Sequence, residues 1–124
     1  MRLKIDSKKG NWVKFVPEFE GNRELPEEEQ ISAEIHWLSH GEKKGYTKRI
    51  TPFMKGRKMH SNADEIDREM FTDNIRNIKN LCFADGVDVT DPDVVYDSCP
   101  EELVNEFMNA INSYGKLNEE DEKN

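Results

Sequence analysis

The sequence predicts an α+β domain, in which antiparallel hairpins of about four strands come first and two amphipathic helices packed on the sheet follow. Two observations predict this class. Apolar residues alternate with polar ones up to residue 50, the period of strands, and recur every three to five residues after residue 61, the period of helices. A hydrophobic content of 35% in 124 residues is enough for one modest core.

The first strands are predicted as a hairpin. Leu3 and Ile5 alternate with charged residues, turn formers follow up to Gly10, and an apolar segment runs from 12 to 16. The next segment, 18–30, contains glycine, proline and three successive glutamates, so we expect a solvated loop there.

The clearest strand signal covers residues 31–37. Ile31, Ala33, Ile35 and Trp37 lie on one predicted face, with Ser32, Glu34 and His36 on a polar face. A partner strand is expected at 46–50, across a turn at 39–45, and Pro52 is expected to end it.

Two helices are predicted in the second half. The first begins at Asn62, with Glu65 as capping-box partner, and carries its apolar residues over about 18 positions. These residues are Ile66, Met70, Phe71, Ile75, Ile78 and Leu81. The second begins at Pro100 and is expected to end at Gly115. Its apolar side carries Leu103, Phe107, Ala110, Ile111 and Tyr114.

These elements predict one domain over residues 1–115. It comprises a β-rich part (1–51), a basic linker (52–60) and a helical part (61–115), and an acidic flexible tail over 116–124 follows it.

Composition excludes several classes of protein. The formal charge is −8, the mean hydropathy is −0.92, and no run of about 18 apolar residues is present, so we expect no membrane partner. The start of the chain alternates apolar with charged residues and lacks the apolar stretch of a signal peptide. Two cysteines, Cys82 and Cys99, are too few for a disulfide scaffold. We therefore expect a cytoplasmic protein with reduced thiols.

No motif predicts catalysis, a metal or a cofactor. His36 and His40 are four residues apart, but on a strand and in a turn they would not converge on zinc. The acidic segment 85–93 lacks the ligand spacing of a calcium loop and is interpreted as turn chemistry. No nucleophile with a positioned base and no phosphate loop is evident, so we expect a protein that is not an enzyme.

The strongest physical feature is a basic patch between residues 43 and 58, which has no acid and includes Tyr46 and Phe53. Its cations are Lys43, Lys44, Lys48, Arg49, Lys55, Arg57 and Lys58. Three interpretations stay open: a solvated strand edge with a linker, contact with an acidic protein or the acidic half of a second copy, and nucleic-acid binding. The net acidic charge makes nucleic acid the weakest of the three.

The methionines and phenylalanines exceed what one narrow helical stripe requires. Met54 and Met59 stand beside Phe53, and Met70 and Met108 beside Phe71 and Phe107. A methionine-rich surface adapts to long partners, while core packing is the simpler alternative.

The second half resembles the small tail assembly chaperones of long-tailed bacteriophages and their prophages. The resemblance covers mainly residues 74–124 and rests on the order of four phrases. These are Asn74–Leu81, Asp85–Val87, Glu102–Glu106 with Asn109–Ile111, and the acidic segment Leu117–Asn124. Val13–Phe19, "VKFVPEF", is compatible with the same family.

The resemblance implies a non-catalytic protein of the bacterial host cytoplasm that coats the tape-measure protein and brings tail-tube subunits to it. Self-association is also expected, because the basic first half of the chain can attract the acidic second half of another copy. As partner-binding residues we expect Ile66, Met70, Phe71, Phe107 and Met108. The alternatives are a phage virion structural or connector protein and a small nucleic-acid-binding module that uses the basic patch.

Overall fold

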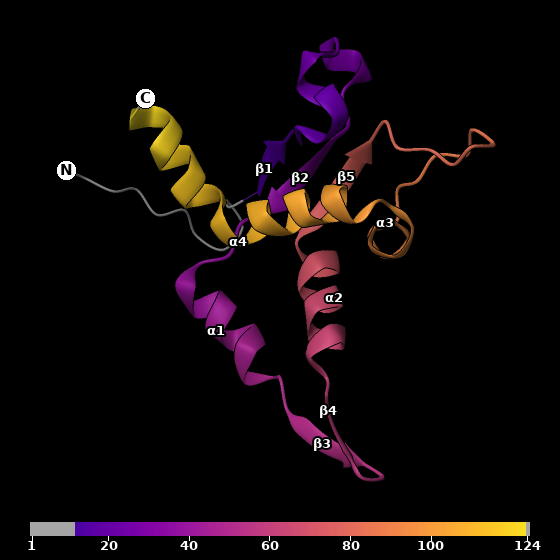
Figure 1. Cartoon of the computed structure of the whole chain (residues 1–124). Helices are drawn as coiled ribbons and strands as arrows, with labels where there is room; N and C mark the ends of the chain where they lie inside the picture. The colour runs from indigo at the N-terminus through magenta and orange to yellow at the C-terminus, as the bar shows by residue number, and fades with distance from the viewer. Residues whose placement is uncertain (1–11, 124) are drawn as a thin grey trace.

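The computed structural model, drawn in Figure 1, describes residues 12–123, with the side chains of residues 12–113. It has the mixed α+β class that the sequence predicts. Three antiparallel strands form the main sheet in the order β1-β2-β5. They are β1 (Trp12–Phe15), β2 (Ser32–His36) and β5 (Ile75–Lys79). The strand expected around Leu3 and Ile5 lies outside the described residues.

The two faces of this sheet differ in character. Val13 pairs with Ile35 and Phe15 with Ala33, and these side chains share the face that carries the core. Lys14 pairs with Glu34 on the opposite face. Ser32 and His36, expected on a solvated face, are buried there instead.

The core lies between the sheet and the helices. Helix α4 (Glu101–Lys123) crosses the sheet (Figure 1), and the backbone N–H of Leu38 donates to the carbonyl of Ile111 at 2.8 Å. The buried cluster consists of Ala33, Ile35, Leu38, Phe71, Ile75, Ile78, Val89, Val95, Leu103, Phe107, Ala110 and Ile111. Within the described part of the chain, no helix combines the length and apolar content that a membrane span needs.

The predicted start and apolar side of the last helix are confirmed, but its predicted end is wrong. Leu103, Phe107 and Ile111 are buried as expected. Helix α4 continues through Gly115 to Lys123 and so includes most of the segment expected as a tail. One glycine costs a helix only about 1 kcal/mol and does not by itself terminate it.

The expected turn at 39–45 and strand at 46–50 are wrong, because helix α1 (His40–Lys48) occupies this segment. The backbone N–H of Glu42 donates to Ser39 Oγ at 3.2 Å, and that of Ser39 donates to Glu42 Oε1 at 3.2 Å. This capping box satisfies donors that the first turn leaves free, so the segment forms a helix despite its two glycines.

The expected basic linker is a two-stranded antiparallel ribbon, which we call the ribbon, made of β3 (Pro52–Lys55) and β4 (Lys58–Ser61). Gly56, with a φ of +67°, supplies the left-handed residue that a tight hairpin turn requires. Pro52 begins a strand instead of ending one, which an edge position tolerates.

The first predicted helix is shorter than expected, with 11 residues instead of about 18. Helix α2 (Ala63–Asp73) begins after Asn62 as predicted, but residues 75–79 form β5. The register of β5 slips by one residue between the pairs Ser32–Lys79 and Glu34–Arg76. This bulge brings Ile75 and Ile78 to the same buried face, although they are three residues apart. A spacing of three between apolar residues is also typical of a helix, which is why these residues were predicted to continue the helix.

Two short segments also differ from expectation. The expected loop at 18–30 contains the 3-10 helices η1 (Phe19–Glu24) and η2 (Glu27–Glu29), held by the buried side chain of Asn22. Asn22 Nδ2 donates to two carbonyls, and Asn22 Oδ1 accepts from the Ile31 N–H at 2.7 Å. Helix α3 (Pro92–Ser98), which sequence reasoning missed, has Asp91 as its N-cap.

Candidate functional site

The basic patch lies on an arm, which we define as residues 39–62. The arm contains α1 and the ribbon and projects away from the sheet (Figure 1). It carries seven cations and one acid, Glu42. Lys43, Lys44 and Lys48 lie on α1, Arg49 is its C-cap, and Lys55, Arg57 and Lys58 are at the tip of the ribbon. The patch is therefore divided between two elements of one arm.

One side of the ribbon, the methionine face, is formed by the opposed residues Met54 and Met59. Met54 is 59% exposed and Met59 is 66% exposed. These values are high for large apolar side chains, which are usually withdrawn from water.

The other side of the ribbon, the cationic face, carries two opposed pairs, Phe53 with His60 and Lys55 with Lys58. The rings of Phe53 and His60 stack with centroids 5.7 Å apart and planes inclined by 21°. Both strands are exposed along their whole length, so each face is open to a partner.

Polar contacts hold the base of the arm against α2. Asn62 Nδ2 donates to the Arg49 carbonyl at 2.8 Å, and Asn62 Oδ1 accepts from the Thr51 N–H at 2.6 Å. Arg49 also forms an ion pair with Glu69. The side chain of Asn62 therefore closes the base of the ribbon. It does not accept a hydrogen bond from the first N–H groups of α2, so the predicted capping box with Glu65 is not formed.

A buried polar joint connects α1 to the sheet. Asn74 Oδ1 lies 2.9 Å from His36 Nδ1, and Asn74 Nδ2 donates to the Tyr46 hydroxyl at 3.2 Å. His36 Nε2 is buried without a hydrogen bond and lies 3.7 Å from Glu42 Oε2. The ring of Trp12 stacks on that of His36, with centroids 5.5 Å apart.

The five residues predicted to bind a partner are separated by the fold. Phe71 and Phe107 have no exposed surface and contact each other in the core, and Ile66 is also buried. Met70 and Met108 are partly exposed. Only these two methionines offer surface to another molecule while the chain stays folded.

Met108 lines a depression between α2, α3 and α4 that sequence reasoning missed, and we call it the acidic groove. Its volume is about 340 Å³, and its lining residues are Asp67, Tyr96, Cys99, Glu101, Val104, Asn105 and Met108. The Tyr96 hydroxyl donates to Asp67 Oδ2 at 3.2 Å. The lining contains two carboxylates, no cation, and the apolar side chains of Val104 and Met108.

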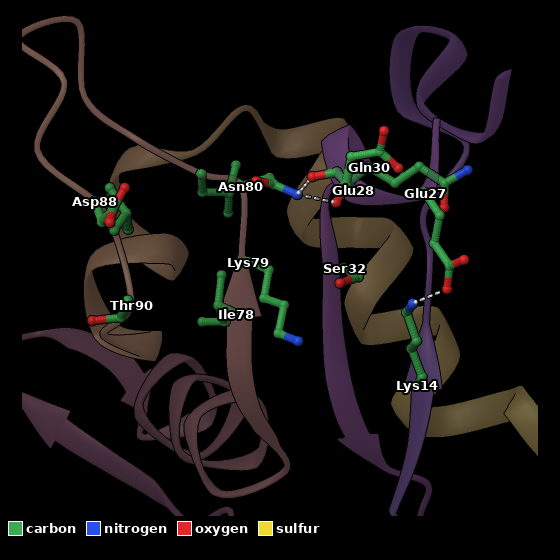
Figure 2. Close-up of a pocket in the computed structure, with 12 residues that line it drawn as sticks. Lys14, Glu27, Glu28, Gln30, Ser32, Ile78, Lys79, Asn80, Asp88 and Thr90 are labelled. Carbon is green, nitrogen blue, oxygen red and sulfur yellow. Dashed lines mark hydrogen bonds and ion pairs between the residues drawn. The ribbon is translucent and has the colours of Figure 1, made fainter. Parts of the chain in front are cut away.

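A second cavity lies on the open face of the sheet, where Figure 2 shows it between η2, the strands and the loop after β5. It has a volume of about 600 Å³. Lys14 Nζ is bonded to Glu27 Oε1 at 3.3 Å across one side. Asn80 Nδ2 donates to the carbonyls of Glu28 and Gln30 at the rim. The cavity therefore mixes charges of both signs, and among its described residues no base is bonded to a nucleophile.

The titratable groups with shifted pKa values belong to structural contacts. Hydrogen bonds from Arg76 and Asn77 lower the pKa of Glu34. A hydrogen bond from Arg68 lowers the pKa of Asp97. Burial raises the pKa of the Cys99 thiol, which makes it a weaker nucleophile at neutral pH.

Among the described residues, no group of three or more His, Cys, Asp or Glu side chains converges on a metal position. His36 is buried in the joint, while His40 is exposed at the start of α1. In the acidic segment 85–93, Asp85 makes a turn as predicted and accepts from the Val87 N–H at 3.0 Å, whereas Asp91 caps α3, a helix that was not predicted.

No model of a protein family, no curated protein and no solved structure matches this chain.

Proposed function

We propose that this chain is a non-enzymatic assembly protein that binds a long helical polypeptide through the methionine face of the ribbon. The observation that carries the proposal is the exposure of Met54 and Met59, opposed on one side of a projecting arm. Methionine is flexible and polarisable, so a pair of exposed methionines fits many apolar surfaces without a single rigid geometry.

Position and charge favour the same function. The arm holds its apolar surface away from the body, where a filamentous partner can approach without steric conflict (Figure 1). The neighbouring cations Lys55, Arg57 and Lys58 complement acidic residues that flank apolar stripes on helical proteins.

The resemblance of residues 74–124 to small tail assembly chaperones identifies the partner class that we propose. Such a chaperone covers the apolar surface of the tape-measure protein before the tail tube encloses it, and recruits tube subunits. A phage virion structural or connector protein is the competing proposal. It differs in one observable respect, because it would remain in purified virions and a chaperone would not.

The test is co-expression with a fragment of the tape-measure protein from the same phage genome. We expect the wild-type chain to keep the fragment soluble and to elute with it. We expect the variant Met54→Ser/Met59→Ser to bind it at least tenfold more weakly, because the apolar contact is lost. Phe83→Ser/Val87→Ser is the matched control, since both residues are exposed apolar side chains outside the arm.

Far-UV circular dichroism should be unchanged for both double variants, because all four side chains are exposed. The proposal is overturned if wild-type protein leaves the fragment insoluble, or if the control weakens binding as much as the methionine variant does.

A further inference from the structure

We infer that the cationic face of the ribbon docks into the acidic groove of a second copy of this chain. The contact would join different surfaces of the two copies, so it is heterologous and builds an open chain or a ring. It uses the side of the ribbon opposite the methionine face. It shares the cations Lys55, Arg57 and Lys58 with the proposed function but is argued independently of it.

On the ribbon side, the cations are available. Lys55, Arg57 and Lys58 are exposed, and within the described residues they form no ion pair. The stacked rings of Phe53 and His60 lie beside the two lysines on the same face. The ribbon therefore presents an aromatic surface next to three free positive charges.

On the groove side, the chemistry is complementary. Asp67 and Glu101 place carboxylates on the lining, and Val104 and Met108 add apolar surface to it. Asp64 lies one turn before Asp67 on α2 and adds negative charge beside the groove, while Arg68 on the same helix is paired with Asp93 and Asp97. Lysines can pair with these carboxylates while an aromatic ring covers the apolar surface.

The ribbon of the same chain does not fill this groove. Figure 1 shows the ribbon leaving the N-terminal end of α2 in the direction opposite to α3 and α4, between which the groove lies. Every residue of both ribbon strands is exposed in the described structure. A ribbon that docks in this groove therefore belongs to another copy.

The distribution of charge over the chain favours a second copy over nucleic acid as the partner of the cationic face. Outside residues 39–62 the chain has 25 Asp/Glu and 11 Lys/Arg, so most of the molecule repels phosphate. The same acids make the rest of one copy attractive to the arm of the next.

The test is sedimentation velocity of the full chain over about a hundredfold range of concentration. We expect wild-type mass to rise above the monomer with concentration and to fall again in about 0.5 M salt, because exposed ion pairs are screened. We expect at least a tenfold loss of association in the ribbon variant Lys55→Gln/Arg57→Gln/Lys58→Gln. The same loss is expected in the groove variant Asp67→Asn/Glu101→Gln.

Mixing the two variants gives the sharpest result. The mixture keeps one intact ribbon and one intact groove, so it should form 1:1 heterodimers that do not grow further. Lys43→Gln/Lys44→Gln/Lys48→Gln is the matched control, with the same charge change on α1, and should associate like the wild type.

Three results would overturn the inference: a wild-type chain that stays monomeric at all concentrations, a mixture that stays monomeric, or a control that associates as weakly as the ribbon variant. Salt-sensitive binding of duplex or single-stranded DNA, lost in the ribbon variant while the wild type stays monomeric, would assign the face to nucleic acid instead. Loss of tape-measure binding in the methionine variant with normal self-association would leave the inference intact.

Discussion

Asn74 joins three parts of the fold through one side chain. Its Oδ1 meets His36 Nδ1 on β2, and its Nδ2 donates to the Met70 carbonyl at 2.6 Å and to the Tyr46 hydroxyl on α1. The residue is only 3% exposed, so water cannot replace these bonds. Each of these hydrogen bonds contributes little net free energy of folding by itself. Losing one is costly because it leaves a buried polar group without a partner.

We predict that Asn74→Ala lowers the free energy of unfolding by about 2–3 kcal/mol, since it leaves buried groups of His36 and Met70 without partners. The measurement is urea unfolding followed by circular dichroism. Asn109→Ala, at an exposed position of α4, is the control and should change stability by less than about 0.5 kcal/mol. Equal effects of the two variants would show that the joint is not important for stability.

Among the elements, β5 departs most from its sequence signal. The strand accommodates an extra residue by placing Asn77 at a φ of +52°, in the left-handed region. Asparagine tolerates this conformation better than other non-glycine residues. Asn77 Nδ2 also donates to Glu34 Oε1 at 2.8 Å, across to β2.

We predict that Asn77→Val destabilises the chain by about 1–2 kcal/mol more than Asn77→Gly, because a β-branched residue is strained at positive φ and glycine is not. Both variants lose the bond to Glu34, so this bond does not contribute to their difference. Elsewhere in a strand valine is the more favourable residue, so a lower stability of Asn77→Val reports strain at positive φ. Chemical unfolding of the two proteins side by side gives the answer. If valine proved as stable as glycine, the bulge would not be present in solution.

At the scale of the whole molecule, large apolar residues occur in two different environments, the buried core and the exposed arm. Phe107 packs edge-on against Phe15 with centroids 5.8 Å apart and has no exposed surface, whereas Met59 is largely exposed at the end of the arm. Most large apolar side chains of the body are buried, with exceptions such as Phe83 and Val87, whereas Phe53, Met54 and Met59 of the arm are exposed.

We predict that Phe107→Ala lowers the free energy of unfolding by about 3–5 kcal/mol through loss of burial and creation of a cavity. Met59→Ala should leave the free energy of unfolding within about 0.5 kcal/mol of wild type, because this side chain is largely exposed to solvent. Thermal and urea unfolding measure both. A small effect of Phe107→Ala would contradict the buried position of this side chain and would favour its predicted role in partner binding.

Local signals were sufficient where one element is specified by its own residues. Asn62 and Pro100 mark helix starts in the sequence, and the buried set Leu103, Phe107, Ala110 and Ile111 follows from spacings of three and four, which together fit one side of a helix. The segment 39–50 was misinterpreted because turn-forming glycines concealed the capping box of Ser39 and Glu42. The capping signal was present and could have been found.

The candidate surfaces were predictable in composition but not in placement. The cations of the arm are evident in the sequence, whereas the opposition of Met54 to Met59 depends on the register of a hairpin that was expected to be a linker. The acidic groove combines residues of α2, α3 and α4, and no periodicity brings residues so far apart in the chain together.

The sequence by itself determined the α+β class, the segregation of positive charge to residues 43–58 and the apolar side of α4, because each depends on neighbours along the chain. Tertiary structure alone decided that Ile75 and Ile78 belong to a strand, that Phe71 and Phe107 are sealed in the core, and that the ribbon stands free. A spacing of three is compatible with a helix and with a bulged strand, and the free energy of packing against β2 selects the strand.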